Sequence, residues 1–210
     1  MLDANATPTR CCHVCQPGVL ARCGLTFSGS VWRAVLLVPP VLACTNWLVH
    51  EYSRSSLSDA LVAALPVTVE KVPFFVAVWM VCLTLLTGFF AIVGLAICAP
   101  AGYDNNAPRK MKAPGEMADR YPTLFRMQSA HNNSYEHLML MMPCFWAAHS
   151  LDLEPLLFAK LSALILVARV AYIVAYVANE DLFRSFFFVV SVTAITRLGF
   201  GSLFPERLAL

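Results

Sequence analysis

Polar and ionisable side chains are concentrated in one part of the chain, between residues 122 and 150. They are Arg126, Gln128, His131, Asn132, Asn133, Glu136 and His137. On a helix Asn133 and Glu136 share one face, and Arg126 lies two turns before Asn133 on nearly the same line. Polar groups inside membrane helices are costly and are candidates for function. We therefore expect this stripe to face the interior of a helical bundle or a neighbouring subunit.

A second polar stripe occurs between residues 156 and 177. Arg169, Tyr172 and Tyr176 stand at positions i, i+3 and i+7 of one helical face. Arg184 follows at the start of the next apolar segment. If the two stripes meet, their guanidinium, carboxylate, amide and phenol groups form a pocket suited to a small zwitterionic ligand with carboxylates. An arginine beside a bound thiol would lower the pKa of that thiol and favour the nucleophilic thiolate.

A purely structural interpretation of the same residues stays open. Arg169 and Glu136 can neutralise each other between two helices. Tyrosines near a membrane interface often belong to an aromatic belt rather than to a binding site. The spacing alone does not choose between a ligand pocket and an internal ion pair.

The spacing of histidine and cysteine does not predict a metal site. His131 and His137 are six residues apart and therefore point to different faces of a helix. Near the N-terminus Cys12 and Cys15 form a C-x-x-C pair, but Cys23 alone does not supply the second pair that a zinc knuckle needs. Lipidation near a membrane, or a tail without metal, explains these cysteines better.

The composition identifies the environment in which these groups must be positioned. Of the 210 residues 59% are hydrophobic and 13% are charged, whereas about a quarter of an average soluble domain is charged. Long apolar runs predict helices that cross a bilayer, because backbone groups in lipid must be paired within their own segment. The net charge of +2, without a basic stripe interleaved with aromatic residues, argues against nucleic-acid binding.

Four apolar segments are long enough to cross the bilayer, which predicts an all-α, transmembrane four-helix bundle. The segments are 73–99, 122–150, 156–177 and 183–204. Short polar breaks between them predict that neighbouring helices pack antiparallel. We assign residues 73–210 to this domain and residues 1–72 to an N-terminal tail with an extra membrane or targeting helix.

The apolar run at residues 31–49 is ambiguous. It contains the ionisable Arg33 and the pair Pro39-Pro40, which is expected to break a helix in its middle. No clean cleavage site for a signal peptide follows it. We favour an extra or peripheral membrane helix over a removed signal sequence.

Basic residues in the connections predict the orientation of the bundle. Between the first two predicted spans lie Arg109, Lys110, Lys112, Arg120 and Arg126. The positive-inside rule puts the connection at 102–121 in the cytosol. The turn at 179–184 must then lie on the same side of the membrane.

A family resemblance rests on three motifs in a fixed order. They are Arg126, Ala130, Asn133 and Glu136 on one predicted helix, the sequence ARVAYIVAY from Ala168 to Tyr176, and Arg184-Ser185. Over residues 73–204 these motifs resemble the MAPEG family, the membrane-associated proteins in eicosanoid and glutathione metabolism. The sequence GYDNNAPR, at residues 102–109, resembles the corresponding loop of the bacterial-type branch of that family.

The resemblance implies a four-helix protomer in a homotrimer, with glutathione as the cofactor, bound between subunits near the cytosolic face. Matching positions would place four side chains against the tripeptide, those of Asn133, Glu136, Tyr172 and Tyr176. Arg184 matches the catalytic arginine that activates the sulfur, and Ser185 matches a serine at the thiol. With the two stripes, Arg126 and Arg169 complete the predicted cofactor-binding set.

Two departures from the family pattern leave two functions open. Ser129 stands where glutathione-using members usually carry an arginine, and Asn132 stands where one branch of the family carries another. Each lost charge-assisted bond removes about 1.5–3 kcal/mol. The first function is a membrane-bound glutathione S-transferase or peroxidase that acts on lipophilic substrates. The second is a non-catalytic, lipid-binding membrane adapter. The family favours the endoplasmic reticulum, while the N-terminal tail leaves a mitochondrial membrane open.

Overall fold

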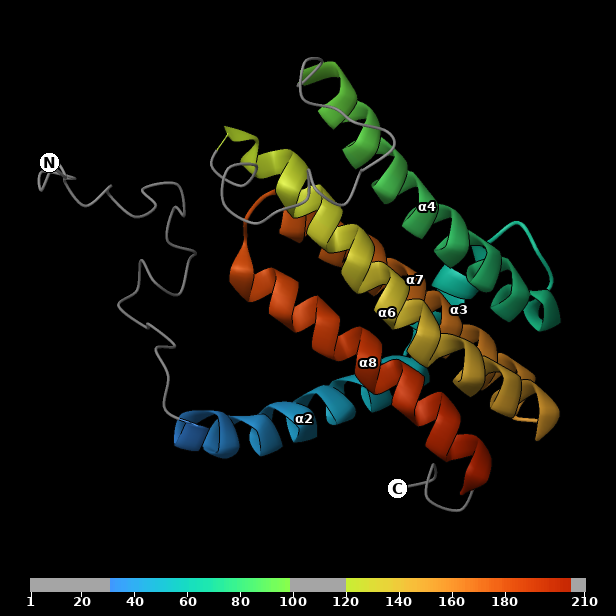
Figure 1. Ribbon diagram of the computed structural model, residues 1–210. Helices are drawn as coiled ribbons and strands as arrows, with labels where there is room; N and C mark the ends of the chain where they lie inside the picture. The colour runs from blue at the N-terminus through green and yellow to red at the C-terminus, as the bar shows by residue number, and fades with distance from the viewer. Residues whose placement is uncertain (1–30, 99–119, 205–210) are drawn as a thin grey trace, which may run out of the picture.

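Four long antiparallel helices form the body of the structure, a computed structural model that describes residues 31–98 and 120–204 (Figure 1). They are α4 (Val72–Cys98), α6 (Pro122–Ser150), α7 (Pro155–Val177) and α8 (Asp181–Leu203). The all-α four-helix bundle predicted from the sequence is confirmed, and no strand occurs in the part of the chain that is described. Each predicted segment corresponds to one of these helices.

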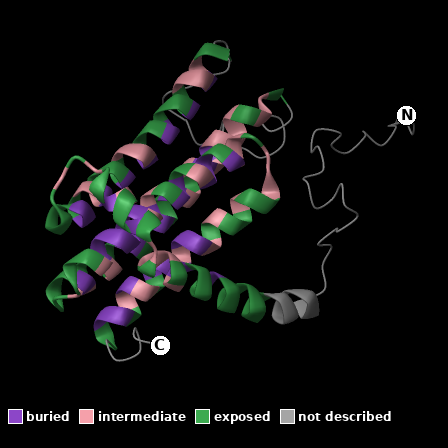
Figure 2. Ribbon diagram, turned by 180° about the vertical axis from the view of Figure 1, so that it is seen from behind, coloured by how far each residue is buried: buried purple, intermediate pink, exposed green. Residues whose placement is uncertain are grey.

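The helices α6 and α7 form the centre of the bundle. They pack against each other, and both contact α4 on one side and α8 on the other, as Figure 1 shows. Buried residues gather where these helices face one another (Figure 2). The largest fully buried apolar side chains are those of Met80, Met141, Leu161, Ile165, Ile195 and Leu198. A polar group on the inner face of α6 or α7 is therefore enclosed by helices on several sides.

Length and hydropathy identify three helices that can cross a membrane: Val69–Cys98, Pro155–Val177 and Asp181–Leu203. The helix α6 is long enough but too polar in its first half to be identified in this way. That half turns Gln128, Ser134 and His137 to the inside, where all three are buried. The chain is thus an integral membrane protein, and α6 buries part of its polar set inside the bundle while Asn132 and Glu136 remain exposed.

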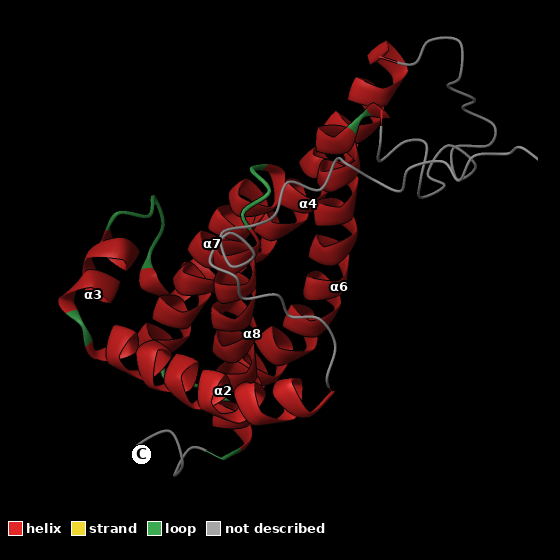
Figure 3. Cartoon of the chain, turned by 90° about the vertical axis from the view of Figure 1, so that its left-hand side faces the viewer, coloured by secondary structure: helices red, strands yellow, loops and turns green. Residues whose placement is uncertain are grey.

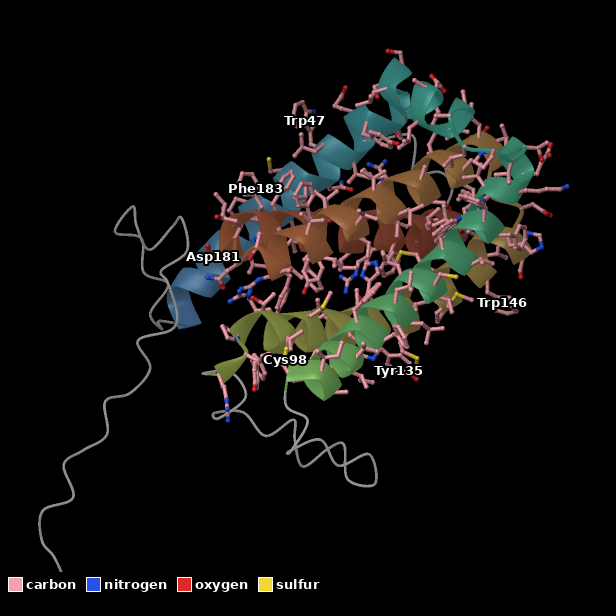
Figure 4. All side chains as sticks on the ribbon, turned by 90° about the horizontal axis from the view of Figure 1, so that it is seen from above. Trp47, Cys98, Tyr135, Trp146, Asp181 and Phe183 are labelled. Atoms are coloured by element: carbon pink, nitrogen blue, oxygen red, sulfur yellow. The ribbon has the colours of Figure 1, made fainter. Side chains whose placement is uncertain are left out.

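The outer surface of the bundle is apolar, as a lipid-facing surface must be. Tyr135 and Trp146 on α6 lie at the outer surface (Figure 4), where Tyr135 is beside α4, and they are 60% and 72% exposed. Phe89 and Phe90 on α4 are also exposed. These side chains would meet acyl chains rather than water.

Both connections that flank α7 are short. In each of them a residue with a positive φ value ends the preceding helix. Asp152 and Asn179 adopt positive φ values of 51° and 64°, a conformation that short polar side chains tolerate and that ends a helix. The backbone amides of Leu153 and Glu180 then bond back to carbonyls of the helix just ended. Tight turns of this kind force α6, α7 and α8 to pack antiparallel.

Two glycines, Gly88 and Gly94, allow α4 to approach α6 closely. A β-carbon at Gly88 would lie 2.7 Å from His131 Nδ1, and one at Gly94 would lie 2.5 Å from a methyl carbon of Leu124. Between them Ala91 is fully buried. Small side chains at helix contacts are the usual way for membrane helices to reach van der Waals contact.

The region before the bundle differs from the prediction. The pair Pro39-Pro40 does not break the helix: α2 (Val31–Arg54) runs through it without interruption. Proline fits helical φ values, and the exposed surroundings of Val38 and both prolines place no neighbouring helix against the distorted turn. The prediction of a break there was wrong.

Two further elements, α3 (Ser56–Ala63) and the short 3₁₀ helix η1 (Val69–Lys71), were not predicted. Both belong to the link between α2 and α4, and α3 packs against α7.

The helix α2 crosses the bundle obliquely, against α8 and α7 (Figure 3). In its C-terminal half Thr45 and Val49 are buried. Trp47 is 59% exposed on the outer side (Figure 4). Within the described residues α2 is not among the helices identified as candidate spans.

Candidate functional site

One end of the bundle carries the polar residues predicted from the sequence, and we call it the site end. It is formed where α4 and α7 end and where α6 and α8 begin; Cys98 and Asp181 mark it in Figure 4. The Tyr121 hydroxyl donates to the Cys98 carbonyl at 2.8 Å, and Arg126 Nε donates to the Val177 carbonyl at 3.2 Å. The connection between α4 and α6 and the turn at 179–184 therefore lie on one side, as predicted. The basic residues Arg109, Lys110 and Lys112 fall outside the described residues.

The two polar stripes meet at Tyr172, which is 3% exposed. Asn133 Nδ2 on α6 donates a hydrogen bond of 2.7 Å to the Tyr172 hydroxyl on α7. The guanidinium carbon of Arg169 lies 4.2 Å from the centroid of the same ring. Spacing on two separate helices thus predicted a real contact between their side chains.

Arg169 lies beneath this contact, fully buried. Its Nη2 donates to Ser134 Oγ at 3.0 Å, whereas Nε and Nη1 have no hydrogen-bond partner. Glu136 is exposed and acts on Arg169 electrostatically, without an ion pair between them in the described part of the chain. The internal Arg169–Glu136 ion pair considered from the sequence is therefore not formed. Arg169 instead fixes Ser134 and the Tyr172 ring from below.

An aromatic chain leads from Tyr172 to Arg184 on α8. The ring centroids of Tyr172 and Tyr176 are 5.6 Å apart, and the Arg184 guanidinium carbon lies 4.7 Å from the Tyr176 centroid. Phe188, one turn after Arg184, reaches the other side of Tyr172 at 6.1 Å between centroids. These contacts bring the candidate catalytic arginine next to the stripe on α7. The contacts with tyrosine are cation–π interactions, which orient a guanidinium without neutralising its charge.

The remaining predicted residues occupy the rim of this cluster. Glu136 and Ser185 are exposed, and neither approaches the Tyr172 hydroxyl closely enough for a hydrogen bond. Arg126 is half-buried and bonds to the end of α7 and to Thr123 Oγ1, at 3.2 Å each. The cluster is therefore open on one side, with Asn133, Tyr176 and Arg184 partly accessible at its surface.

Two serines that support this cluster from inside the bundle, Ser134 and Ser191, were not singled out by sequence reasoning. Ser134 accepts from Arg169, and His137, 1% exposed, shares a hydrogen bond of 2.9 Å with Ser191 on α8. Ser134 could have been found, because it lies one turn before His137 on the buried face of α6. Ser191 gave no signal, since serine is common in membrane helices and its partner comes from a distant part of the sequence.

The two histidines of α6 do face different helices, as their spacing predicted. His137 meets Ser191 on α8, while His131 Nδ1 lies 2.7 Å from the Thr84 carbonyl on α4 and so must donate to it. No group of three or more possible metal ligands occurs within residues 31–98 and 120–204. The N-terminal cysteines Cys12 and Cys15 lie outside these ranges.

Fold and site together define a class: a multi-pass helical membrane protein with arginine, tyrosine and amide groups converging at one end of a four-helix bundle. A family model narrows this class. Residues 71–204, more than half of the chain, match the MAPEG family, and the chain belongs to that family. No curated protein and no solved structure gives a significant match. The loop at 102–109, on which the likeness to the bacterial-type branch rests, lies outside the described residues.

Proposed function

We propose that this protein is a membrane-bound, glutathione-dependent transferase or peroxidase that acts on lipophilic substrates. Membership of the MAPEG family supports a glutathione-related membrane function in general. The single observation that carries the finer proposal is the continuous cluster from Asn133 through Tyr172 and Tyr176 to Arg184. It joins three helices at one end of the bundle, where the membrane surface and a charged peptide can meet.

The chemistry of the cluster around Tyr172 fits glutathione, which carries two carboxylates, one ammonium group and a thiol. Glu136 presents an exposed carboxylate for the ammonium group. Asn133 and Tyr176 offer amide and phenol groups for the peptide and carboxylate oxygens. Arg184 forms no ion pair within the described residues, so its charge remains available for an anion. These are the partners that such a ligand needs.

The role proposed for Arg184 is electrostatic. A guanidinium held beside a thiol stabilises the thiolate and lowers the pKa of that thiol, so that more of it is in the reactive form at neutral pH. The ring of Tyr176 fixes the guanidinium in place. Bound glutathione would supply the thiol that displaces a leaving group from an electrophilic carbon. In the peroxidase reaction it would act together with a second glutathione molecule, so that two thiols reduce a hydroperoxide to alcohol and water and become a disulfide.

A neighbouring subunit would complete the glutathione site that the cluster around Tyr172 begins. Glu136 and Ser185 are exposed in the protomer, although each lies on a helix that packs into the bundle on its other face. A homotrimer in which another copy covers these residues would close the cradle around the tripeptide. The apolar outer surface would allow a lipophilic substrate to enter from the bilayer, and we place the protein in the endoplasmic reticulum membrane.

Calorimetric titration of the detergent-solubilised protein with glutathione tests this proposal. Saturable binding is expected for the unchanged protein, with turnover of a lipophilic electrophile lost in Arg184→Ala. Arg120→Ala is the matched control, because it removes an exposed guanidinium near the same end of the bundle. The absence of glutathione binding by the correctly assembled protein would contradict the proposal.

The alternative, a non-catalytic lipid-binding adapter, is favoured by Ser129. Its hydroxyl donates to the Phe125 carbonyl of its own helix at 3.0 Å and adds no charge where glutathione-using relatives are expected to carry arginine. Ser129→Arg separates the two functions. A gain of glutathione binding from an undetectable level in this variant would favour the adapter, whereas binding already present without the substitution favours the enzyme.

A further inference from the structure

A cavity of about 370 Å³ lies between α2, α7 and α8, at the end of the bundle opposite to the site end. Its lining includes the cationic side chains of Arg54, Lys160 and Arg197, together with His50. These residues come from three helices that are far apart in the sequence. None of them belongs to the cluster around Tyr172, and the inference drawn from them does not depend on glutathione.

The two carboxylates near this cavity are already engaged. Asp59 pairs with Lys160 Nζ at 2.7 Å, and Lys160 also donates to the Ser53 carbonyl at 3.1 Å. Glu154 caps α7 by accepting from the backbone amides of Leu156 and Leu157, at 3.2 and 2.7 Å. Asp59 is thus paired with Lys160, and Glu154, which lines the cavity and keeps its charge, forms no ion pair with either arginine within the described residues.

Both arginines instead meet one imidazole. Arg197 Nη2 lies 3.1 Å from His50 Nδ1, and Arg54 Nη1 lies 3.4 Å from His50 Nε2. A neutral imidazole has only one acceptor nitrogen, so only one of these contacts can be a hydrogen bond and the other sets donor against donor. Arg197 Nη1 also donates to the Asn46 carbonyl at 3.2 Å. No carboxylate pairs with Arg54 or Arg197 in the described residues. An anion in the cavity would resolve this arrangement.

The position of the cavity in the membrane indicates which anion. Leu156 and Leu157 belong to the first turn of α7, and Arg197 lies six residues before the end of α8 at Leu203. Since α7 and α8 are both candidate spans, their ends lie near the lipid headgroups. The cavity combines arginines with these two leucines, which suits an amphiphile better than a free ion. We propose that it binds the phosphate of an anionic glycerophospholipid.

Lipid binding to the purified full-length protein tests this proposal. After delipidation in a non-ionic detergent, the protein is titrated with phosphatidylglycerol and, separately, with phosphatidylcholine, and native mass spectrometry counts the bound lipids. We expect one phosphatidylglycerol per chain to bind at least about tenfold more tightly than phosphatidylcholine, because both lipids offer the same phosphate but the choline cation is repelled by the arginines. Equal affinity for the two lipids would overturn the proposal.

Two variants assign the binding to this cavity. Arg197→Gln and Arg54→Gln should each weaken phosphatidylglycerol binding about tenfold. Lys71→Gln, which removes an exposed cation at the same end but outside the cavity, should leave it unchanged. If Arg197→Gln does not assemble, the exposed Arg54 carries the test. If Arg54→Gln binds phosphatidylglycerol as tightly as the unchanged protein, the assignment is contradicted. It is also contradicted if Lys71→Gln weakens binding as much as Arg54→Gln does.

Inorganic phosphate distinguishes a lipid from a free anion. A lipid site requires the acyl chains as well as the phosphate, so millimolar inorganic phosphate should not displace phosphatidylglycerol. Complete displacement by phosphate at such concentrations would show a site for small anions and overturn the lipid assignment.

Discussion

The two ends of the bundle hold their positive charges in different ways. At the site end the guanidinium groups of Arg169 and Arg184 rest on tyrosine rings, at 4.2 and 4.7 Å. At the opposite end Lys160 pairs with Asp59, and Arg197 contacts His50 and a backbone carbonyl. A ring orients a cation while leaving its charge in place, whereas a carboxylate cancels that charge. The comparison teaches that both ends keep arginine charge, on tyrosine rings at the site end and against an imidazole at the opposite end, and that only the lysine charge is cancelled.

Removal of Arg169 should destabilise the site end more than any other substitution considered for the two ends. Arg169→Ala leaves a cavity at a fully buried position and deprives Ser134 and the Tyr172 ring of their shared partner. We expect the free energy of unfolding in detergent to fall by about 3 kcal/mol. Arg120→Ala, an exposed arginine near the same end, should not change the free energy measurably. Equal values for the two variants would show that burial of Arg169 does not organise the site.

Glycine substitutions compare the packing of two helix contacts. Gly88→Ala would place a β-carbon 2.7 Å from the ring of His131, which the Thr84 carbonyl holds at 2.7 Å, and should cost about 2 kcal/mol. Gly199→Ala meets the Cys144 sulfur at 2.8 Å. That thiol can rotate about χ1, so the loss should be smaller. Thermal unfolding measures the stability of both variants. A larger loss of stability in Gly199→Ala than in Gly88→Ala would contradict this explanation.

Loss of one phenol hydroxyl tests the contact between the stripes more finely. Tyr172→Phe removes the acceptor for Asn133 in a buried setting and should lower the free energy of unfolding by about 1 kcal/mol. Tyr121→Phe removes a hydroxyl at the exposed edge of the same end, where water can replace the lost bond to Cys98. Denaturant unfolding should therefore show a clear loss only for Tyr172→Phe. Similar losses in the two variants would exclude a special role for the inner hydroxyl.

The smallest effect is expected at the opposite end. Asp59→Asn removes an ion pair whose carboxylate side chain is 55% exposed, so solvent screens most of its contribution and the loss should stay below about 1 kcal/mol. The loss should shrink further at high salt, because exposed charges are screened. Glu70→Gln, an exposed carboxylate outside this pair, is the control. A large, salt-independent loss in Asp59→Asn would mean that this end is organised like the site end.

The bundle could be predicted because its signals are local. Apolar length predicted the four helices to within a few residues, and the i, i+3 and i+7 spacing put Tyr172 on one face with Arg169 and Tyr176. Average hydropathy misses α6 because its first half is polar. Its apolar second half still allowed the sequence to predict it as a span.

The rest depends on tertiary contacts that leave no trace in a single sequence. Nothing local to Arg169 indicates Ser134 as its partner, and nothing in α8 indicates that Ser191 meets His137. Proline does not reliably predict the end of a helix where no neighbouring helix packs against it. The break predicted at Pro39 and Pro40 is therefore absent from α2. The crossing of α2 over α7 and α8 follows from side-chain fit and could not be read from its composition.

The most direct test of the proposed glutathione site is the ultraviolet absorbance of the thiolate at neutral pH. Adding glutathione to the unchanged protein should produce a thiolate band, because a guanidinium beside the sulfur lowers the pKa of the thiol. The band should be absent in Arg184→Ala at saturating glutathione and present in Arg120→Ala. A band of equal size in Arg184→Ala, or none in the unchanged protein with glutathione bound, would contradict the account.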